Sequence, residues 1–228
     1  YSGHDWFYET AKWMAGKVSV PVAIHLDHGD SFERCMEMLK LGFTSIMFDG
    51  SALPVEENAA ATEAVARVCR SFGVPLEAEI GELCRLDDRG NKIGASNIAD
   101  PDVVRQYLKL CHPDSLAIGI GNAHGFYNGP VDIRVEVLEE CRKFTDIPFV
   151  LHGCTGMDEE LVKRSIDSGV AKINFGTQVR CQYVNYLKEG LAEGKDQGHA
   201  WKLSQYAELR LREDIKDIIR LAGSKEKA

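Results

Sequence analysis

Residues 22–49 read VAIHLDHGDSFERCMEMLKLGFTSIMFD, and this stretch decides the fold. Its pattern predicts an apolar strand over residues 22–27, a helix over 31–41 that ends at Gly42, and a second strand over 45–49. Short, continuous apolar runs are typical of parallel strands that are buried on both faces. The stretch therefore predicts a β-α-β unit, from which parallel α/β domains are built.

The same alternation repeats along the rest of the chain, without a Gly/Ser-rich linker. Further strands are predicted over residues 76–80, 115–120, 149–152 and 172–175. Helices are predicted over residues 8–17, 55–71, 102–110, 133–144 and 157–168, with a polar helical region over 207–221. Six βα units in succession indicate one parallel α/β domain that covers residues 1–228.

A doubly wound sheet and a barrel both fit this alternation. A dinucleotide-binding sheet would place G-x-G-x-x-G between a strand and a helix, but the glycines at 119–125 are spaced differently and no helix follows them. We therefore expect a TIM-type (β/α)8 barrel. Such a barrel has eight strands in about 250 residues, so we expect the first two strands to be missing from this chain, which is then N-terminally incomplete.

Charge and composition narrow the possible partners. The chain has 228 residues, 44% of them hydrophobic, a formal net charge of −8 and no stripe of Lys and Arg. These properties argue against nucleic acid and a membrane as partners, and no run approaches the roughly 18 apolar residues of a membrane span. Seven cysteines without a C-x-x-C pair, and no signal peptide, favour reduced thiols in the cytoplasm.

Polar side chains follow the predicted strands at their carboxyl ends, where the active sites of barrels lie. His28, His124 and His152 each follow such a strand. A single histidine there is most simply explained by a local hydrogen bond, but three imidazoles with an open fourth position suit a catalytic zinc ion. Asp49 and Glu79 lie at the same rim and could orient these ligands or serve as alternative metal ligands.

The first predicted strand leaves one metal ligand undecided. His25 and Asp27 are two residues apart and share a face, whereas His28 faces the other way if the strand continues. Gly29 would let the chain turn and bring His28 inward. The spacing alone therefore leaves His25 and His28 as alternatives.

Two glycine-rich loops form a candidate anion site. Residues 153–156, Gly-Cys-Thr-Gly, follow the fifth predicted strand, and residues 174–177, Asn-Phe-Gly-Thr, follow the sixth. The loops after the last strands of a barrel often bind phosphate through backbone N–H groups. Ordinary turns that need glycine for their conformation are the alternative explanation.

Seven short motifs occur in order along the chain. They are His25-Leu26-Asp27-His28-Gly29, Phe48-Asp49-Gly50-Ser51, Glu56-Glu57-Asn58, Glu77-Ala78-Glu79-Ile80-Gly81, Ala123-His124-Gly125-Phe126-Tyr127, Leu151-His152-Gly153 and Lys172-Ile173-Asn174. Each motif is modest alone, and the ordered set is highly specific. It resembles one enzyme family, the class II fructose-bisphosphate and tagatose-bisphosphate aldolases, and the resemblance runs from about Pro21 to Thr177.

The resemblance assigns a role to each group of site residues. It implies that His28, rather than His25, binds Zn²⁺ with His124 and His152, and that Asp27 handles the proton of the substrate hydroxyl at the cleaved bond. It places the phosphate of a ketose near Gly125, Gly153, Thr155, Asn174 and Thr177. In such enzymes zinc polarises the ketose carbonyl and stabilises the enediolate, and the products are typically dihydroxyacetone phosphate and an aldehyde. A monovalent cation is a further candidate cofactor, and a homo-oligomer, dimer or tetramer, is expected.

The sequence departs from the family pattern where the substrate is recognised. Asp87 is the residue nearest to the acidic group that moves the enediolate proton in relatives. Asn128 stands where many relatives have Lys, and Gly176 where Asn, Asp or Ala is frequent. These changes indicate an aldolase whose substrate differs from fructose 1,6-bisphosphate.

Two other functions remain as alternatives. A metal-dependent hydrolase on a barrel would use zinc hydroxide as its nucleophile, but many such enzymes have an H-x-H pair, which this chain lacks. A catalytically altered relative could act as a sugar-phosphate-binding protein or subunit, because a fold does not fix an activity.

Overall fold

The computed structural model describes residues 3–81, 84–86, 92–93, 98–125 and 132–227. Two residues singled out in the sequence, Asp87 and Asn128, lie outside the described residues. A six-stranded sheet forms the centre of the protein, and all of its strand pairs are parallel. In their order across the sheet, the strands are β1 (His25–Gly29), β2 (Ser45–Phe48), β3 (Leu76–Ile80), β6 (Ser115–Ile118), β8 (Phe149–Leu151) and β9 (Val170–Ile173).

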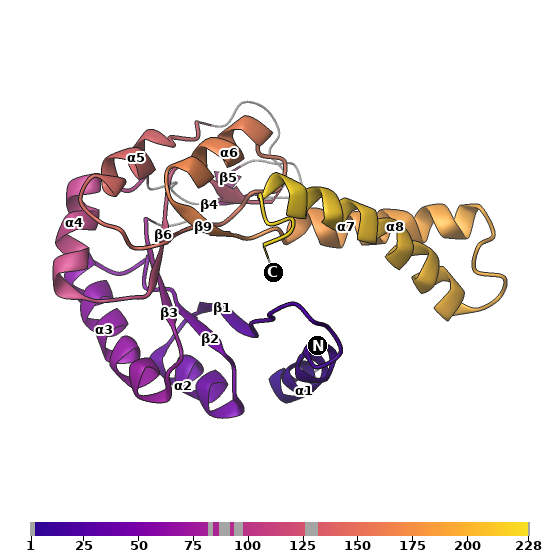
Figure 1. Cartoon of the computed structure of the whole chain (residues 1–228), viewed down its shortest axis with the longest axis horizontal. Helices are drawn as coiled ribbons and strands as arrows, with labels where there is room; N and C mark the ends of the chain where they lie inside the picture. The colour runs from indigo at the N-terminus through magenta and orange to yellow at the C-terminus, as the bar shows by residue number, and fades with distance from the viewer. Residues whose placement is uncertain (1–2, 82–83, 87–91, 94–97, 126–131, 228) are drawn as a thin grey trace.

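Helices cover the outer face of this sheet, which curls around an interior (Figure 1). They are α1 (His4–Ala15), α2 (Phe32–Leu41), α3 (Val55–Phe72), α4 (Pro101–Leu110), α5 (Glu136–Arg142) and α6 (Glu159–Asp167). Gly42 at the end of α2 adopts a left-handed conformation, as predicted for a helix-terminating glycine. The parallel pairing and the alternating helices confirm the predicted α/β class.

The curl brings the two edge strands of the sheet together through their side chains. Lys172 on β9 places its Nζ atom 3.4 Å from Nε2 of His25 on β1. Asn174, just after β9, donates a hydrogen bond from Nδ2 to Oδ1 of Asp27, at 3.1 Å. The strands thus enclose an interior that polar side chains span from one edge to the other.

Two apolar clusters hold the helices on the sheet. The larger one lies around β3, β6 and β8 and includes Tyr107 and Phe149, both fully buried. The smaller one lies around β1 and β2 and includes Met38 and Ile46. Burial of such side chains contributes roughly 1.5–3 kcal/mol each, so these clusters fix the strand ends from which the polar residues project.

A long helical hairpin differs most from the sequence expectation. α7 (Thr177–Ala192) was not predicted, and α8 (Ala200–Leu221) begins earlier than the predicted helical region at 207. The two helices pack on each other and project away from the sheet (Figure 1). Only Gly190 of α7 is buried, so the helix has no apolar stripe of the kind that marks a helix packed on a core.

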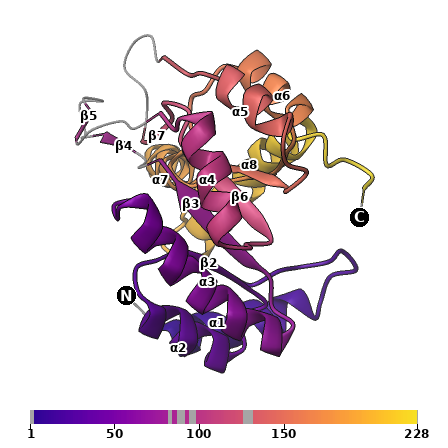
Figure 2. The same ribbon diagram turned by 90° about the vertical axis from the view of Figure 1, so that its left-hand side faces the viewer.

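Smaller differences concern strand bounds. β1 begins at His25 rather than at residue 22, and Val22 is exposed. A second sheet, in the order β5-β4-β7, consists of the short strands β5 (Lys92–Ile93), β4 (Cys84–Leu86) and β7 (Ala123–His124). In Figure 2, β4 and β5 lie at the left edge of the view. Among the described residues, none of the helices combines the length and apolarity needed to cross a bilayer.

Candidate active site

The end of β1 turns at His28 itself. His28 has a φ of 50°, a left-handed conformation that is uncommon for residues other than glycine. The pairing of β1 with β2 becomes irregular between Leu26 and Gly29 at the same point. His28 therefore faces the interior together with Asp27, although strict alternation would place the two on opposite faces.

Gly29 has a different role from the one expected, because it supplies space rather than the turn. A Cβ atom at this position would lie 2.5 Å from the backbone oxygen of Met47 and 2.9 Å from Sγ of Cys35. Only glycine fits so close to the neighbouring strand and to α2. The close packing at Gly29 thus holds the turned residue before it in place.

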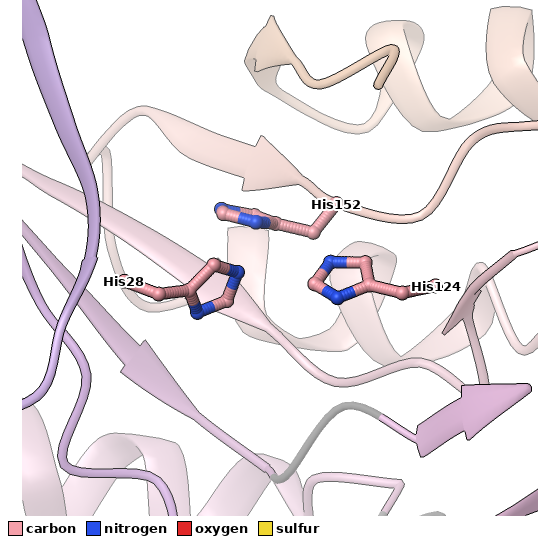
Figure 3. A group of neighbouring side chains, drawn as sticks. All are labelled: His28, His124 and His152. Atoms are coloured by element: carbon pink, nitrogen blue, oxygen red, sulfur yellow. The ribbon is translucent and has the colours of Figure 1, made fainter. Parts of the chain in front are cut away.

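Three imidazole rings from distant parts of the chain converge beside this turn. His28 comes from β1, His124 from β7, and His152 from the residue after β8, and Figure 3 shows the three side chains pointing toward one another. Ring centroids are 5.1 Å apart for His28 and His124, 4.8 Å for His28 and His152, and 6.1 Å for His124 and His152. One ring nitrogen of each histidine lies within 4.8 Å of the others.

The hydrogen bonds of His28 suit a metal ligand. Its Nδ1 atom lies 2.7 Å from Oδ2 of Asp49, whereas its Nε2 atom is buried and has no hydrogen-bond partner among the described residues. Burial lowers the pKa of His28, but the hydrogen bond to Asp49 and the charges of nearby carboxylates together outweigh burial and raise the pKa above its usual value. For Asp49 the signs are reversed: burial raises the pKa of its carboxyl, but hydrogen bonds from His28 and Ser51 lower that pKa to about 2. Asp49 is therefore an anion that orients the ring of His28.

Glu79 lies behind the same ring. It is buried, and its Oε2 atom is 3.6 Å from Nδ1 of His28. His28, Asp49 and Glu79 form a second group whose ligand atoms lie within 4.8 Å of one another. The two carboxylates predicted at this rim thus contact the histidine they were expected to orient, and they also form an alternative set of donors.

His152 is oriented by a carboxylate that the sequence analysis did not select. Its Nε2 atom lies 2.8 Å from Oε1 of Glu77, while Nδ1 lies 3.2 Å from Nδ2 of Asn174. Both His152 and Glu77 are almost fully buried. Strand parity could have identified Glu77, because Glu77 and Glu79 are two residues apart on β3 and face the same interior.

His25, the alternative ligand, lies deeper in the interior. Its Nδ1 atom is 2.7 Å from Oγ of Ser45, and its Nε2 atom faces Lys172. Burial, followed by the charge of Lys172, lowers the pKa of His25 to about 4. His25 is therefore a neutral ring in a buried polar network, and it is absent from both groups of possible metal ligands.

A pocket of about 230 Å³ opens in front of His28 and His124. It collects the predicted acid/base residue and all five residues predicted to surround the phosphate. Its lining consists of Asp27, His28, His124, Gly125, Gly153, Thr155, Asn174, Gly176, Thr177 and Arg180. Thr155 connects the two loops, because its Oγ1 atom accepts a hydrogen bond from the backbone N–H of Gln178 at 3.1 Å.

Arg180 is a further pocket residue that the sequence analysis missed. It lies one turn after Thr177 on α7, and its Nη2 atom is 3.3 Å from Oγ1 of that residue. Among the described residues no carboxylate lies within ion-pair distance of Arg180. A Cβ atom at position 176 would lie 3.2 Å from Nη1, so Gly176 leaves room for the guanidinium. The i, i+3 spacing from Thr177 would have indicated Arg180, had α7 been predicted.

The cysteine beside the pocket does not resemble a nucleophile. Cys154 is buried, and burial raises the pKa of its thiol to about 12. Thiolates are the reactive form of cysteine, so this residue fills space in the loop.

A curled parallel sheet with histidines and carboxylates at its carboxyl rim defines a barrel protein with a candidate metal centre. A family model described as fructose-bisphosphate aldolase class-II matches residues 1–227. The chain belongs to the class II fructose-bisphosphate aldolase family.

Individual relatives agree with this membership. The chain is 38% identical over 212 residues to a probable fructose-bisphosphate aldolase of Bacillus subtilis (strain 168), covering 93% of this chain and 74% of that protein. It is 40% identical over 161 residues to a 6-phospho-5-dehydro-2-deoxy-D-gluconate aldolase of Bacillus velezensis, covering 71% of this chain but only 55% of that protein.

The structural comparison supports the TIM-type fold. The crystal structure of the YdjI aldolase from Escherichia coli K12 superimposes with a TM-score of 0.82 at 29% identity, covering 98% of this chain and 77% of that one. The predicted fold class and the family resemblance are therefore confirmed.

Proposed function

We propose that this protein is a zinc-dependent aldolase that reversibly cleaves a ketose phosphate, giving dihydroxyacetone phosphate and an aldehyde. One observation supports this function above all others: three histidines and Asp27 meet at one end of a pocket whose other end is built for an anion. Membership of the aldolase family agrees with it.

His28, His124 and His152 are the proposed zinc ligands, with Asp49 and Glu79 orienting them or offering alternative donors. The donor set fits this ion, because three imidazoles that leave one position open are typical of catalytic zinc. The buried Nε2 atom of His28, which no described residue meets, supports the assignment. When bound, zinc would supply Lewis-acid chemistry at the ketose carbonyl.

Asp27 is the proposed acid/base residue. Its carboxylate lines the pocket, and Asn174 fixes it by donating a hydrogen bond to Oδ1 at 3.1 Å. In the cleavage direction, Asp27 takes the proton from the hydroxyl on the carbon that is released. The O–H electron pair then forms the C=O bond of the aldehyde, the C–C bond breaks, and its electrons form the enediolate of the other product. Proton return to that carbon completes the reaction, and Asp87 remains the residue proposed for this step from the sequence.

The far end of the pocket suits the phosphate group. Gly125, Gly153, Thr155, Asn174 and Thr177 are the residues proposed to surround it, and the hydroxyls of the two threonines can donate hydrogen bonds to phosphate oxygens. α7 begins at Thr177 without an acidic residue in its first turn, so the positive end of this helix is not neutralised locally. Arg180 adds a guanidinium at the same place.

The test combines metal analysis with a substrate panel. The zinc-loaded protein is assayed for retro-aldol cleavage of ketose mono- and bisphosphates, as wild type, as Asp27→Asn and as the matched control Asp30→Asn. Asp30 is an exposed aspartate three residues away, outside the pocket. We expect Asp27→Asn to lower kcat by about 100-fold or more, with bound zinc unchanged, and Asp30→Asn to behave as wild type.

Two outcomes would contradict the proposal. Cleavage of no ketose phosphate by a zinc-loaded protein would leave a sugar-phosphate-binding role, detectable as binding without turnover. Wild-type rates in Asp27→Asn would remove Asp27 from the mechanism.

A further inference from the structure

A chain of buried and partly buried polar side chains crosses the interior beneath the candidate metal centre. It runs from Ser45 through His25, Lys172 and Glu77 to His152, and thus joins β2, β1, β9 and β3 to the residue after β8. Burying a polar group costs free energy unless the group has a hydrogen-bond partner. The members of this chain must therefore hydrogen-bond one another.

Glu77 is the central member because each of its oxygens has a different partner. Oε1 lies 2.8 Å from Nε2 of His152, and Oε2 lies 2.9 Å from Nζ of Lys172. The side chain of Glu77 is 2% exposed and that of His152 is 1% exposed, so water does not compete for the bond between them, whereas the side chain of Lys172 is 35% exposed. A carboxylate only accepts hydrogen bonds, so a neutral His152 must carry its proton on Nε2.

The other nitrogen of His152 faces the candidate metal centre. Nδ1 lies 3.2 Å from Nδ2 of Asn174, an amide nitrogen that can only donate, which requires a lone pair on Nδ1. The two neighbours therefore agree on one tautomer. A lone pair directed toward the site is what a metal ligand needs.

We propose that Glu77, fixed by Lys172, is a positioning residue that holds His152 in the Nε2–H tautomer and so directs the Nδ1 lone pair at the metal. The proposal rests on the proposed metal centre, and it adds two residues that have no assigned role. Lys172 matters because it occupies the second oxygen of Glu77 and fixes the rotation of the carboxylate.

The hydrogen-bond donors and acceptors of the three side chains predict the outcome of Glu77→Gln. Glutamine offers one oxygen and one NH2 group, and the ammonium of Lys172 can only donate. The amide oxygen should therefore turn to Lys172 and the NH2 group to His152, which moves the imidazole proton to Nδ1. In Glu77→Gln/Lys172→Met the amide can rotate and present its oxygen to His152 again, so the original tautomer should return.

Two measurements test this prediction in the intact chain of 228 residues. Nitrogen-15 NMR of the metal-free protein reports the tautomer of His152, with His152→Asn assigning its signal, and competition with a chelator reports the dissociation constant for zinc. We expect an inverted tautomer and a zinc affinity about 10–100-fold weaker in Glu77→Gln. The double variant should recover the tautomer and most of the affinity, whereas a loss of packing alone would not be reversed by a second buried substitution.

The matched control is Glu63→Gln. Glu63 also contacts a histidine and a cation, His112 and Arg70, but on the surface of α3. The Glu63→Gln variant should leave the zinc affinity and the NMR signal of His152 unchanged.

Several results would overturn the proposal. These are an Nδ1–H tautomer in the wild type, an unchanged tautomer with zinc affinity within about threefold of wild type in Glu77→Gln, or a folded double variant that binds zinc as weakly as the single one. The wild-type measurement decides even if Glu77→Gln fails to fold. Failure of the aldolase function is a separate result, because the tautomer and zinc affinity are measured without substrate.

Discussion

Two trios of the same chemistry lie in different surroundings in this protein. Glu77 binds His152 and Lys172 in the interior, and Glu63 binds His112 and Arg70 on the surface. The histidine side chain is 1% exposed in the interior trio and 73% exposed in the surface trio. In each trio the glutamate contacts a histidine and a cation. The cations are exposed to similar extents, 35% for Lys172 and 45% for Arg70, so the trios differ in the burial of the glutamate and the histidine.

The pKa values of the two glutamates do not separate these trios. In each case burial raises the pKa of the carboxyl, and hydrogen bonds from its histidine and cation outweigh burial and leave the pKa below its usual value. What differs is the consequence of removing a partner. A buried group left alone loses both its partner and access to water, whereas a surface group regains water. A lowered pKa thus indicates a carboxylate with hydrogen-bond partners, and burial determines how much stability is lost when a partner is removed.

Removing the glutamate from each trio should give the largest difference between the trios in the free energy of unfolding. Glu77→Leu leaves the buried N–H of His152 without its partner and removes the carboxylate from the partly exposed ammonium of Lys172, so it should lower the free energy of unfolding by about 3 kcal/mol. Glu63→Leu should change it by about 1 kcal/mol or less. Urea denaturation of both variants measures the difference, and equal losses would show that burial does not separate the trios.

The second effect in order of size should be a loss of stability in acid, through His25 in the interior network. The pKa of His25 is about 4 in the folded protein, against 6.5 for an ordinary histidine, because burial, Lys172 and His152 disfavour its charged form more than Glu77 and Asp27 favour it. Between pH 6.5 and pH 4, His25 binds a proton in the unfolded chain but not in the folded protein. The contribution of His25 to the free energy of unfolding is therefore complete above pH 6.5 and is lost as the pH falls toward 4. The loss is about 3 kcal/mol.

The matched variant for this acid test is His25→Gln, in which the loss over that pH range should be much smaller. Glu63 acts in a separate range, because a carboxyl with a lowered pKa contributes stability above its usual pKa of 4.5 and loses it only in stronger acid. An unchanged slope between pH 6.5 and 4 in His25→Gln would assign the acid sensitivity to other groups.

Zinc removal should have an effect of similar size that depends on the interior trio alone. An ion at 100 times its dissociation constant stabilises the folded state by about 2.7 kcal/mol. Thermal unfolding with zinc and with a chelator should therefore differ by this amount in wild type and Glu63→Gln, and by less in Glu77→Gln. An equal gain in all three proteins would place the ion away from His152.

Salt should produce the smallest effect, confined to the surface trio. The contribution of Glu63, measured as the stability difference between wild type and Glu63→Gln, should be below about 1 kcal/mol and shrink further in 1 M NaCl, where charges are screened within about 3 Å. The corresponding difference for Glu77→Gln should mostly persist, since solvent ions do not reach the bond between Glu77 and His152, whose side chains are 2% and 1% exposed. Loss of both differences in salt would contradict the burial of the interior trio.

The sequence was sufficient for the fold because buried parallel strands leave continuous apolar runs, such as residues 76–80 and 149–152. It was insufficient for α7, whose side chains are mostly outside the core and show no apolar stripe. Arg180 was missed for the same reason, because its place in the pocket follows from the start of that helix.

For the site, the sequence predicted which strand ends meet, and the structure brings those residues together. It could not decide between His25 and His28, because one left-handed residue overrides the alternation on which the parity argument depends. It also missed Glu77, whose role depends on which residue lies opposite on another strand. The metal, acid/base and phosphate roles of these residues remain predictions.

The turn at His28 also determines what kind of change β1 can tolerate. An alternating strand of this length would send every second residue outward, but here His25, Asp27 and His28 all face inward from five residues. Substitution at one of them alters a single contact. Insertion or deletion of one residue would instead exchange the inward and outward sets and place a residue with a Cβ atom where the close packing admits only glycine. Over evolutionary time the length of this strand should therefore be more constrained than its composition.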